Sequence, residues 1–198
     1  FSSVSLLSFS EVSETGDTTG HIRLGTTSHE NAAGAYLPYT GGNPRAFLAG
    51  DIWLSSTGDL YNHPAYLTYG TYELNTIAHE IGHSLGLAHP FTVYNGYGTD
   101  FSVGAAHNAM PYTIMSYAEY IGQPSGSGFA DDFFHPTTLM IDDIAALQHL
   151  YGVNNQYNAG DNTYTLGSFS NNSLNWIYAS IWDAGGTDTF SWADQSSI

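Results

Sequence analysis

The segment from His79 to His89 (HEIGHSLGLAH) constrains the fold of this chain more than any other segment. Each residue of an α-helix turns by about 100°, so His79 and His83 lie on one helical face, one turn apart. Gly86 follows closely and favours a left-handed turn that ends the helix. The chain can then present His89 to the same point from another direction. A fold for this sequence must therefore let a helix, a tight turn and a third histidine converge.

Hydrophobic periodicity predicts two helices. The first covers residues 71–85, with Thr71 as a plausible N-cap. Its apolar residues recur at three- and four-residue spacing, at Leu74, Ile77, Ala78, Ile81 and Leu85. The second runs from about Thr138 to Tyr151, where Gly152 stops it. Asp142 and Asp143 open this second helix and favour its dipole.

Short strands are predicted before the first helix, in apolar segments bounded by Gly, Pro or Asn. The candidates are Val4 to Val12, His21 to Leu24, Ala35 to Tyr39 and Asp51 to Leu54. Residues 91–134 are rich in Gly, Tyr and Asn and are interpreted as a long functional or metal-supported loop. The chain therefore combines helices and strands.

Three neutral imidazoles meeting at one point are typical of a zinc site. Zinc binds histidine nitrogen at about 2.0–2.1 Å, and a catalytic zinc keeps one position open for water. Glu80 points about 100° away from His79, so it can stand beside that water as a general base rather than on the metal. The other histidines show no ligand spacing. The pattern predicts hydrolysis of peptide bonds.

Charge and composition exclude several classes of partner. The chain has 18 Asp and Glu but only Arg23 and Arg45 as cations, which gives a formal net charge of −16. Nucleic acids and anionic membranes carry the same sign and are poor partners. No apolar run approaches the roughly 20 residues that a membrane helix needs. The absence of cysteine excludes thiolate metal sites and cysteine nucleophiles.

Two segments resemble those of a known protease family. His79 to Pro90 (HEIGHSLGLAHP), followed by Thr113 to Tyr117 (TIMSY), resembles the serralysin family of bacterial zinc metalloproteases, which are metzincins of the RTX-type secreted alkaline proteases. The resemblance extends over nearly the whole chain and implies a secreted, extracellular zinc endopeptidase without disulfides. It also implies that His79, His83 and His89 bind Zn²⁺ and that Glu80 is catalytic.

The resemblance implies roles for two more residues near the histidines. Met115 corresponds to the methionine of the family's Met-turn, which packs beneath the zinc ligands without binding the metal. Tyr117 corresponds to a tyrosine that binds zinc in the resting enzyme and can swing away to hydrogen-bond the oxyanion. Without the resemblance, both would be interpreted as ordinary core or surface residues.

The fold implied is α/β (α+β): a metzincin-like catalytic domain with a twisted five-stranded mixed sheet and an active-site helix. Its edge strand would lie near Asp51 to Ser55 and pair with an extended peptide substrate. The catalytic domain would cover residues 1–152, without the family's first helix. Residues 153–198 would form the truncated start of a C-terminal calcium-binding β-roll, so the chain is expected to be a fragment of a longer protein.

The resemblance also implies a Ca²⁺ site made of oxygen atoms, which this hard cation prefers. Its ligands would come from Asn158, Gly160, Asn162, Asp183, Gly185, Gly186 and Asp188. Asn158 departs from the family, which usually has arginine there. On the residues alone, the segment from Asp183 to Asp188 equally fits a turn-forming loop.

Further expectations are a monomer, extended protein or peptide substrates and a proteinaceous inhibitor. Two alternatives remain open. One is a non-catalytic calcium-binding or adhesive module with a structural zinc site, against which the intact Glu80 argues. The other is a peptidase from another metzincin branch.

Overall fold

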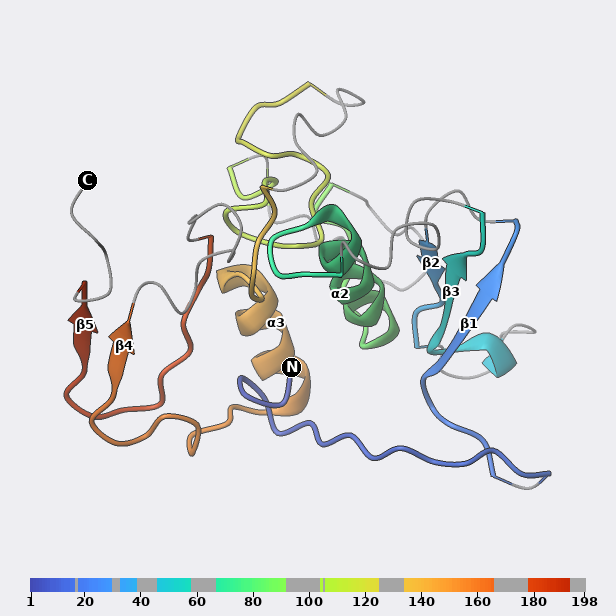
Figure 1. Cartoon of the computed structure of the whole chain (residues 1–198), viewed down its shortest axis with the longest axis horizontal. Helices are drawn as coiled ribbons and strands as arrows, with labels where there is room; N and C mark the ends of the chain where they lie inside the picture. The colour runs from blue at the N-terminus through green and yellow to red at the C-terminus, as the bar shows by residue number, and fades with distance from the viewer. Residues whose placement is uncertain are drawn as a thin grey trace.

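The computed structural model describes residues 1–16, 18–29, 33–38, 46–57, 67–91, 104, 106–124, 134–165 and 178–192. Across these residues, the chain is a mixed α/β structure with two α-helices, a short 3-10 helix (η1, Ala46–Leu48) and two small sheets (Figure 1). None of the described helices is long and apolar enough to cross a membrane.

The larger sheet has the strand order β1-β3-β2. Strand β1 (Arg23–Thr27) runs parallel to β3 (Asp51–Ser55), and β2 (Ala33–Ala35) pairs with β3 in the antiparallel direction. The expectation that Asp51 to Ser55 forms an edge is therefore wrong, because β3 is paired on both sides. Strands β1 and β2 are instead the edges of the sheet in the described residues. The five-stranded sheet stays a prediction, because the sheet in the described residues has three strands.

An ion pair fixes the start of the parallel strands. Arg23 and Asp51 are register partners, and Arg23 Nε and Nη2 donate to the two Asp51 carboxylate oxygens at 2.6 and 2.7 Å. This fork-to-fork geometry is the strongest form of the pair. Arg23 is the one Lys or Arg in the described part of the chain.

The strand predicted over Val4 to Val12 is wrong. Among the described residues this segment makes only an isolated bridge, between Ser5 and Val153, and Leu6 and Phe9 are exposed. The segment instead anchors the N-terminus to the second helix, since Gln148 Nε2 donates to the Val4 carbonyl oxygen at 3.2 Å. The strand predicted at 35–39 lies earlier, at β2, and Tyr39 is outside the described residues.

Both helices are confirmed. Helix α2 (Tyr72–Ser84) has Thr71 as N-cap, whose side chain accepts from the Leu74 N–H. Helix α3 (Ile141–Tyr151) begins later than predicted and ends at Gly152, which has φ +82°. Because its first turn is capped by Asp143, which accepts from the Met140 N–H at 2.9 Å, the helix starts after Met140 rather than at Thr138.

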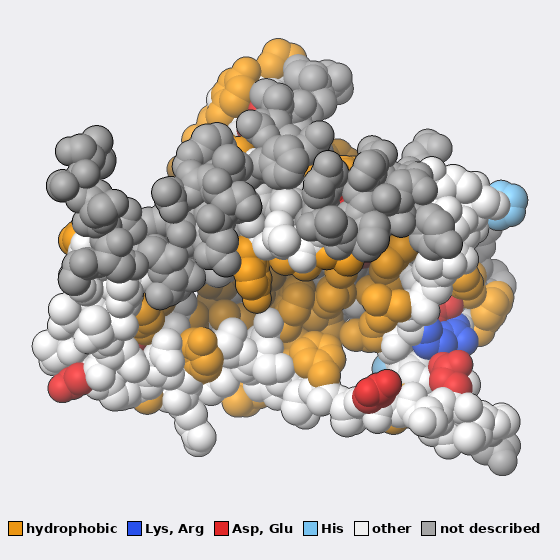
Figure 2. Space-filling view, in the orientation of Figure 1, with side chains coloured by type: hydrophobic (Ala, Val, Ile, Leu, Met, Phe, Trp, Pro, Cys, Tyr) orange, Lys and Arg blue, Asp and Glu red, His pale blue; other side chains and the backbone are white. Residues whose placement is uncertain are grey.

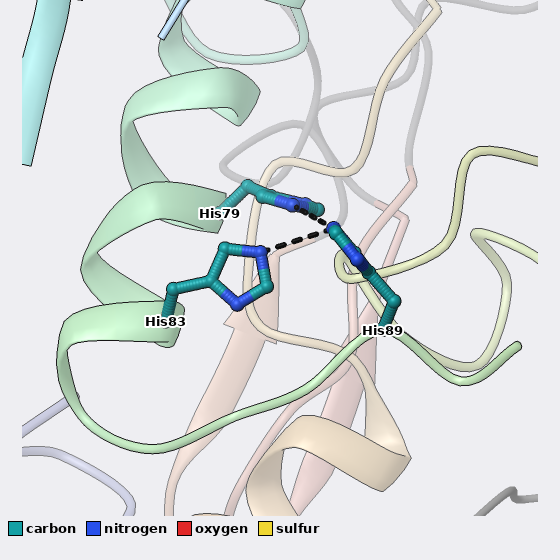
Figure 3. A group of neighbouring side chains, drawn as sticks. All are labelled: His79, His83 and His89. Carbon is teal, nitrogen blue, oxygen red and sulfur yellow. Dashed lines mark hydrogen bonds between the residues drawn. The ribbon is translucent and has the colours of Figure 1, made fainter. Parts of the chain in front are cut away.

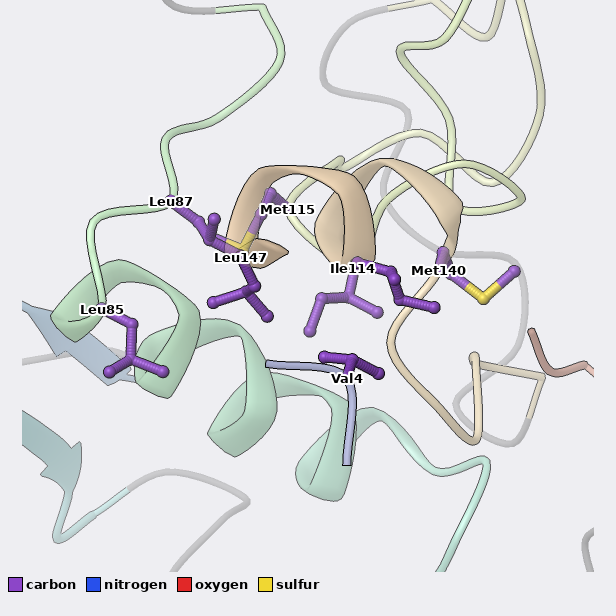
Figure 4. Close-up of a cluster of buried hydrophobic side chains, with 8 residues drawn as sticks. Val4, Leu85, Leu87, Ile114, Met115, Met140 and Leu147 are labelled. Carbon is purple, nitrogen blue, oxygen red and sulfur yellow. The ribbon is translucent and has the colours of Figure 1, made fainter. Parts of the chain in front are cut away.

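The hydrophobic core lies between α2 and α3 (Figure 4). Its buried members are Val4, Leu85, Leu87, Ile114, Met115, Met140, Ile144 and Leu147. Figure 2 shows hydrophobic side chains gathered over the middle of the molecule, where Figure 1 places the two helices. The core therefore supports the turn that follows α2 and the segment around Met115.

A second, two-stranded sheet lies on the far side of α3 from the larger one (Figure 1). It is formed by β4 (Thr163–Thr165) and β5 (Thr189–Ser191), which run parallel. The proposed boundary at residue 152 between two domains stays a prediction.

Candidate metal centre

The end of α2 turns the chain back toward the helix. Gly86 has φ +96°, which a residue with a Cβ atom rarely adopts. The Gly86 N–H donates to His83 O and the Leu87 N–H donates to Gly82 O, both at 2.9 Å. This pair of hydrogen bonds is a Schellman motif. The turn directs the following residues, including His89, back past the last turn of α2.

Three imidazoles meet beside this turn (Figure 3). His89 Nε2 lies 3.1 Å from His79 Nε2 and 3.0 Å from His83 Nε2. The three candidate ligand atoms lie within 4.8 Å of one another, and this is the one such group of His, Asp and Glu in the described part of the chain. The structure thus brings together the three histidines that the sequence singles out.

The outer nitrogens of two rings fix their tautomers. His79 Nδ1 lies 2.8 Å from Ile114 O, and His83 Nδ1 lies 2.7 Å from Leu87 O. A carbonyl oxygen can only accept, so each Nδ1 carries the proton and each Nε2 presents a lone pair. His89 Nε2 can donate its one proton fully to only one of them, so without a cation at least one of these lone pairs lacks a full donor.

This donor set fits zinc. Tetrahedral ligation with bonds of about 2.0–2.1 Å separates ligand nitrogens by about 3.3 Å, close to the 3.0 and 3.1 Å found here. Neutral imidazole nitrogens are also the ligands that zinc accepts readily. His79, His83 and His89 could therefore hold the ion with little movement.

The environment keeps these rings neutral. Burial, followed by the nearby His83, lowers the pKa of His79 to about 3 and that of His89 to about 4. Burial also lowers the pKa of His83. Because a metal competes with protons for the imidazole, rings that are neutral near pH 7 are ready to bind it.

A buried carboxylate organises the segment beneath the histidines. Asp143 accepts from Thr113 Oγ1 at 2.6 Å and from the Ile114 N–H at 2.9 Å. Burial raises the pKa of Asp143 to about 6. The sequence alone predicts only an interaction with the helix dipole for this residue. A signal was available, because Asp143 falls on the same helical face as the apolar Met140 and Leu147.

Met115 packs against α2 at Gly82. It is 2% exposed, and a Cβ added at Gly82 would approach its Sδ to 2.8 Å. The absence of a side chain at Gly82 therefore lets Met115 pack close against α2, between the positions of His79 and His83 in the sequence. This contact is a packing contact and does not make Met115 a metal ligand.

Glu80 and Tyr117 border a pocket of about 130 Å³ next to His79. Glu80 is 7% exposed, whereas Tyr117 is 55% exposed. The Tyr117 ring lies 5.5 Å from the His79 ring and 4.7 Å from the His89 ring. The rest of the pocket wall comes from Ala33, Tyr72, Asn75, Thr76 and Ser116. The pocket thus lies between Ala33 of strand β2 and His79, one of the three imidazoles.

The residues proposed for calcium lie in two segments that the structure brings together. The Asn162 N–H donates to Asp188 Oδ1 at 2.9 Å, and the Gly185 N–H donates to Asp183 Oδ1 at 2.8 Å. The side-chain NH₂ group of Asn162 donates to the carbonyl oxygens of Gly160 and Asn158, at 2.7 and 3.1 Å.

Two further features of this region were not foreseen. The Tyr164 hydroxyl donates to Asp183, and Asp161 accepts from the Thr187 N–H at 2.8 Å. Gly185 and Gly186 have φ +151° and +119°. Both aspartates are thus engaged by protein donors in this structure.

Comparisons with known proteins agree with this geometry. Residues 10–143 match the model of the Metallo-peptidase family M12B Reprolysin-like. Metalloprotease AprA of Pseudomonas entomophila (strain L48) is 33% identical over 202 residues, which cover 94% of this chain and 40% of the relative. Serralysin B of Dickeya chrysanthemi is 34% identical over 174 residues, covering 82% of this chain and 34% of the relative.

A third relative, Serralysin of Proteus mirabilis, is 34% identical over 157 residues, covering 72% of this chain and 30% of its own length. This chain therefore spans less than half the length of each of these relatives. The family match covers both α2 and the segment around Met115. The chain belongs to the reprolysin-like metallopeptidases and is a member of the serralysin family of metalloproteases.

Proposed function

We propose that this chain is the catalytic part of a secreted zinc endopeptidase, with His79, His83 and His89 as zinc ligands and Glu80 as general base. The observation that carries the proposal is the convergence of three Nε2 atoms, two of which cannot carry a proton. A cation at this point would accept the lone pairs of all three rings at once.

Zinc, when bound, would polarise the scissile carbonyl and lower the pKa of water at the same site. Glu80 would take a proton from the attacking water as its oxygen bonds to the carbonyl carbon. The same carboxylic acid would then give the proton to the amide nitrogen as the C–N bond breaks. A nearly buried carboxylate in a pocket wall is suited to this transfer, because bulk water competes little for the proton.

Tyr117 would act on the oxygen of the substrate carbonyl. By family resemblance its phenol would be a zinc ligand in the resting enzyme and would donate a hydrogen bond to the developing oxyanion. The contacts of its ring with His79 and His89, together with its exposure, support a side chain that reaches the reaction site and can move.

Extended segments of protein are the proposed substrates. Strand β2 is paired only with β3 among the described strands, and Ala33 borders the same pocket as Glu80. A peptide added along β2 would place one side chain in that pocket. A purely structural zinc site would be closed, whereas this one adjoins a pocket, which favours the enzyme over a non-catalytic module.

We also propose a second domain, from residue 153, that begins a calcium-binding β-roll. The ligands would be Asn158, Gly160, Asn162, Asp183, Gly185, Gly186 and Asp188. The carbonyl oxygens of Gly160 and Asn158, which both lie beside the Asn162 side chain, support this, since Ca²⁺ prefers such oxygens. The extracellular location, the monomeric state and a proteinaceous inhibitor are parts of the same proposal that rest on the family resemblance.

Hydrolysis of casein by the chain tests the enzymatic function. A zinc chelator should abolish the activity and added zinc should restore it. Glu80→Gln should keep one zinc and lose about 10³-fold or more in kcat, because the general base is gone. Glu11→Gln is the same substitution at an exposed residue and should leave kcat unchanged. Full turnover by Glu80→Gln would show that another group is the base.

A further inference from the structure

The three imidazoles are not held in the same way. His79 and His83 each have Nδ1 on a backbone carbonyl oxygen, whereas His89 makes no hydrogen bond through Nδ1 within the described part of the chain. Histidines that bind metals usually have such an outer partner, which sets the orientation of the ring. The orientation of His89 therefore has another source.

Rotation of a histidine ring about its Cβ–Cγ bond has a broad energy profile, so the bond alone does not fix the ring. In His89 this rotation decides whether Nε2 points at His79 and His83 or away from them. His89 also lies beyond the end of α2, on the segment that leaves the Schellman turn. Among the described residues, contacts with its ring faces supply this restraint.

Phe91 makes a contact of this kind with one face of the His89 ring. Its ring lies 4.9 Å from the His89 ring and is 7° from parallel to it. Tyr117 contacts His89 as well, at 4.7 Å and 56°, and Phe91 lies 5.2 Å from Tyr117. The three rings thus form one cluster in which Phe91 defines the plane of His89.

Phe91 contributes little else to the fold. It is 45% exposed and does not belong to the hydrophobic core between α2 and α3. An aromatic side chain that remains this exposed while lying parallel to a proposed ligand is poorly explained by packing alone. Its stacking energy would instead act on the histidine beside it.

We propose that Phe91 is a positioning residue for zinc: its stacked ring keeps His89 Nε2 directed at the ion, as the outer hydrogen bonds of Nδ1 do for His79 and His83. This inference rests on the zinc site proposed above. It predicts that the aromatic face of Phe91, rather than its apolar volume, determines how tightly the site binds zinc.

Zinc affinity of the whole chain, measured by competition with a chromophoric chelator, tests the proposal. Phe91→Ala and Phe91→Leu should both weaken zinc binding by about threefold to tenfold, because neither has a ring face. Phe91→Tyr keeps the face and should bind within about twofold of the wild type. Phe47→Ala, which removes another exposed phenylalanine, should change nothing.

A spectroscopic readout separates positioning from loss of structure. The visible absorption of the Co²⁺-substituted chain reports ligand geometry, and it should change in Phe91→Leu but not in Phe91→Tyr. The melting temperatures of the zinc-free variants should match the wild type. Equal zinc affinity in the wild type, Phe91→Ala and Phe91→Leu would overturn the role of Phe91 alone. A wild type that binds no zinc would overturn the proposed function, and this inference with it.

Discussion

Asp143 and Ile114 are joined by a hydrogen bond of 2.9 Å from the Ile114 N–H to the Asp143 carboxylate. The carbonyl oxygen of the same Ile114 accepts from His79 Nδ1 at 2.8 Å. One residue thus connects the first turn of α3 to a proposed zinc ligand on α2. The contact is buried, so water cannot replace either partner.

Removing this carboxylate should weaken both the fold and the site. Asp143→Ala leaves the N–H groups of Ile114 and Met140 buried without their acceptor. We expect a loss of about 3–5 kcal/mol in the free energy of unfolding, together with weaker zinc binding because His79 loses its support. Urea denaturation and a zinc titration measure the two effects.

The neighbouring Asp142→Ala is the matched control. Asp142 pairs with His107 at 2.8 Å, but both side chains are partly exposed. Such pairs contribute about 1 kcal/mol or less. Equal destabilisation by the two changes would contradict a special role for Asp143.

Acidification should destabilise the zinc-free chain. The pKa values of His79 and His89 are lowered by burial to about 3 and about 4, from an ordinary value of 6.5. Between these values the unfolded chain binds more protons than the folded chain, so stability is lost as the pH falls below about 6.5. Urea denaturation of the zinc-free chain at about pH 7.5 and about pH 5 measures this loss.

Asp143 acts with the opposite sign. Its pKa is raised by burial to about 6, so lowering the pH from about 6 to about 4 relieves the cost of its buried charge. Two histidines outweigh one carboxyl group, and the net effect is a loss. Asp143→Asn removes the opposing contribution and should make the loss on acidification steeper. A zinc-free wild type that becomes more stable at about pH 5 would contradict the burial of neutral histidines.

Gly86 should tolerate no side chain without strain. A Cβ at this position would meet only Leu150 and Pro38, at 3.7 and 3.9 Å, so crowding is not the obstacle. The obstacle is φ +96°. Gly86→Ala should therefore lower stability by about 1–2 kcal/mol, and Gly86→Asn by less. Thermal melts measure the difference.

Gly16→Ala provides the comparison for Gly86, since Gly16 has open space around it and no positive φ. This change should be close to neutral. If Gly86→Ala were equally neutral, the turn after α2 would not depend on a left-handed residue.

Tyr117→Phe should separate chemistry from metal binding. The three histidines remain, so the variant should still bind one zinc, whereas loss of the phenol should lower kcat by about 10²-fold. Casein hydrolysis and the zinc content of the same sample provide the measurement. Tyr120→Phe, at another exposed tyrosine, should behave as the wild type. Unchanged kcat in Tyr117→Phe would remove the phenol from the mechanism.

The helices and the three histidines could be predicted because their signals are local. The spacing of His79 and His83 and the glycine at position 86 determine α2 and its end within a dozen residues of sequence. The predicted limits, 71–85, agree with Tyr72–Ser84 because the capping residues are Thr71 and Leu85.

The sheet order and the role of Asp143 could not be predicted in the same way. Strand β3 is interior because β1 and β2 both pair with it, and nothing within Asp51–Ser55 reports those partners. Val4 to Val12 has a strand-like composition but has no partner strand in the described residues. Asp143 acts through residues about 30 positions away, Thr113 and Ile114.

X-ray absorption at the zinc edge, on the purified chain with one equivalent of zinc, tests the central claim most directly. The three-histidine site predicts imidazole scattering from three ligands, with Zn–N distances of about 2.0–2.1 Å, and its loss in a chain carrying His79→Ala, His83→Ala and His89→Ala. A wild-type spectrum with oxygen ligands alone, or a chain that retains no stoichiometric zinc, would contradict it.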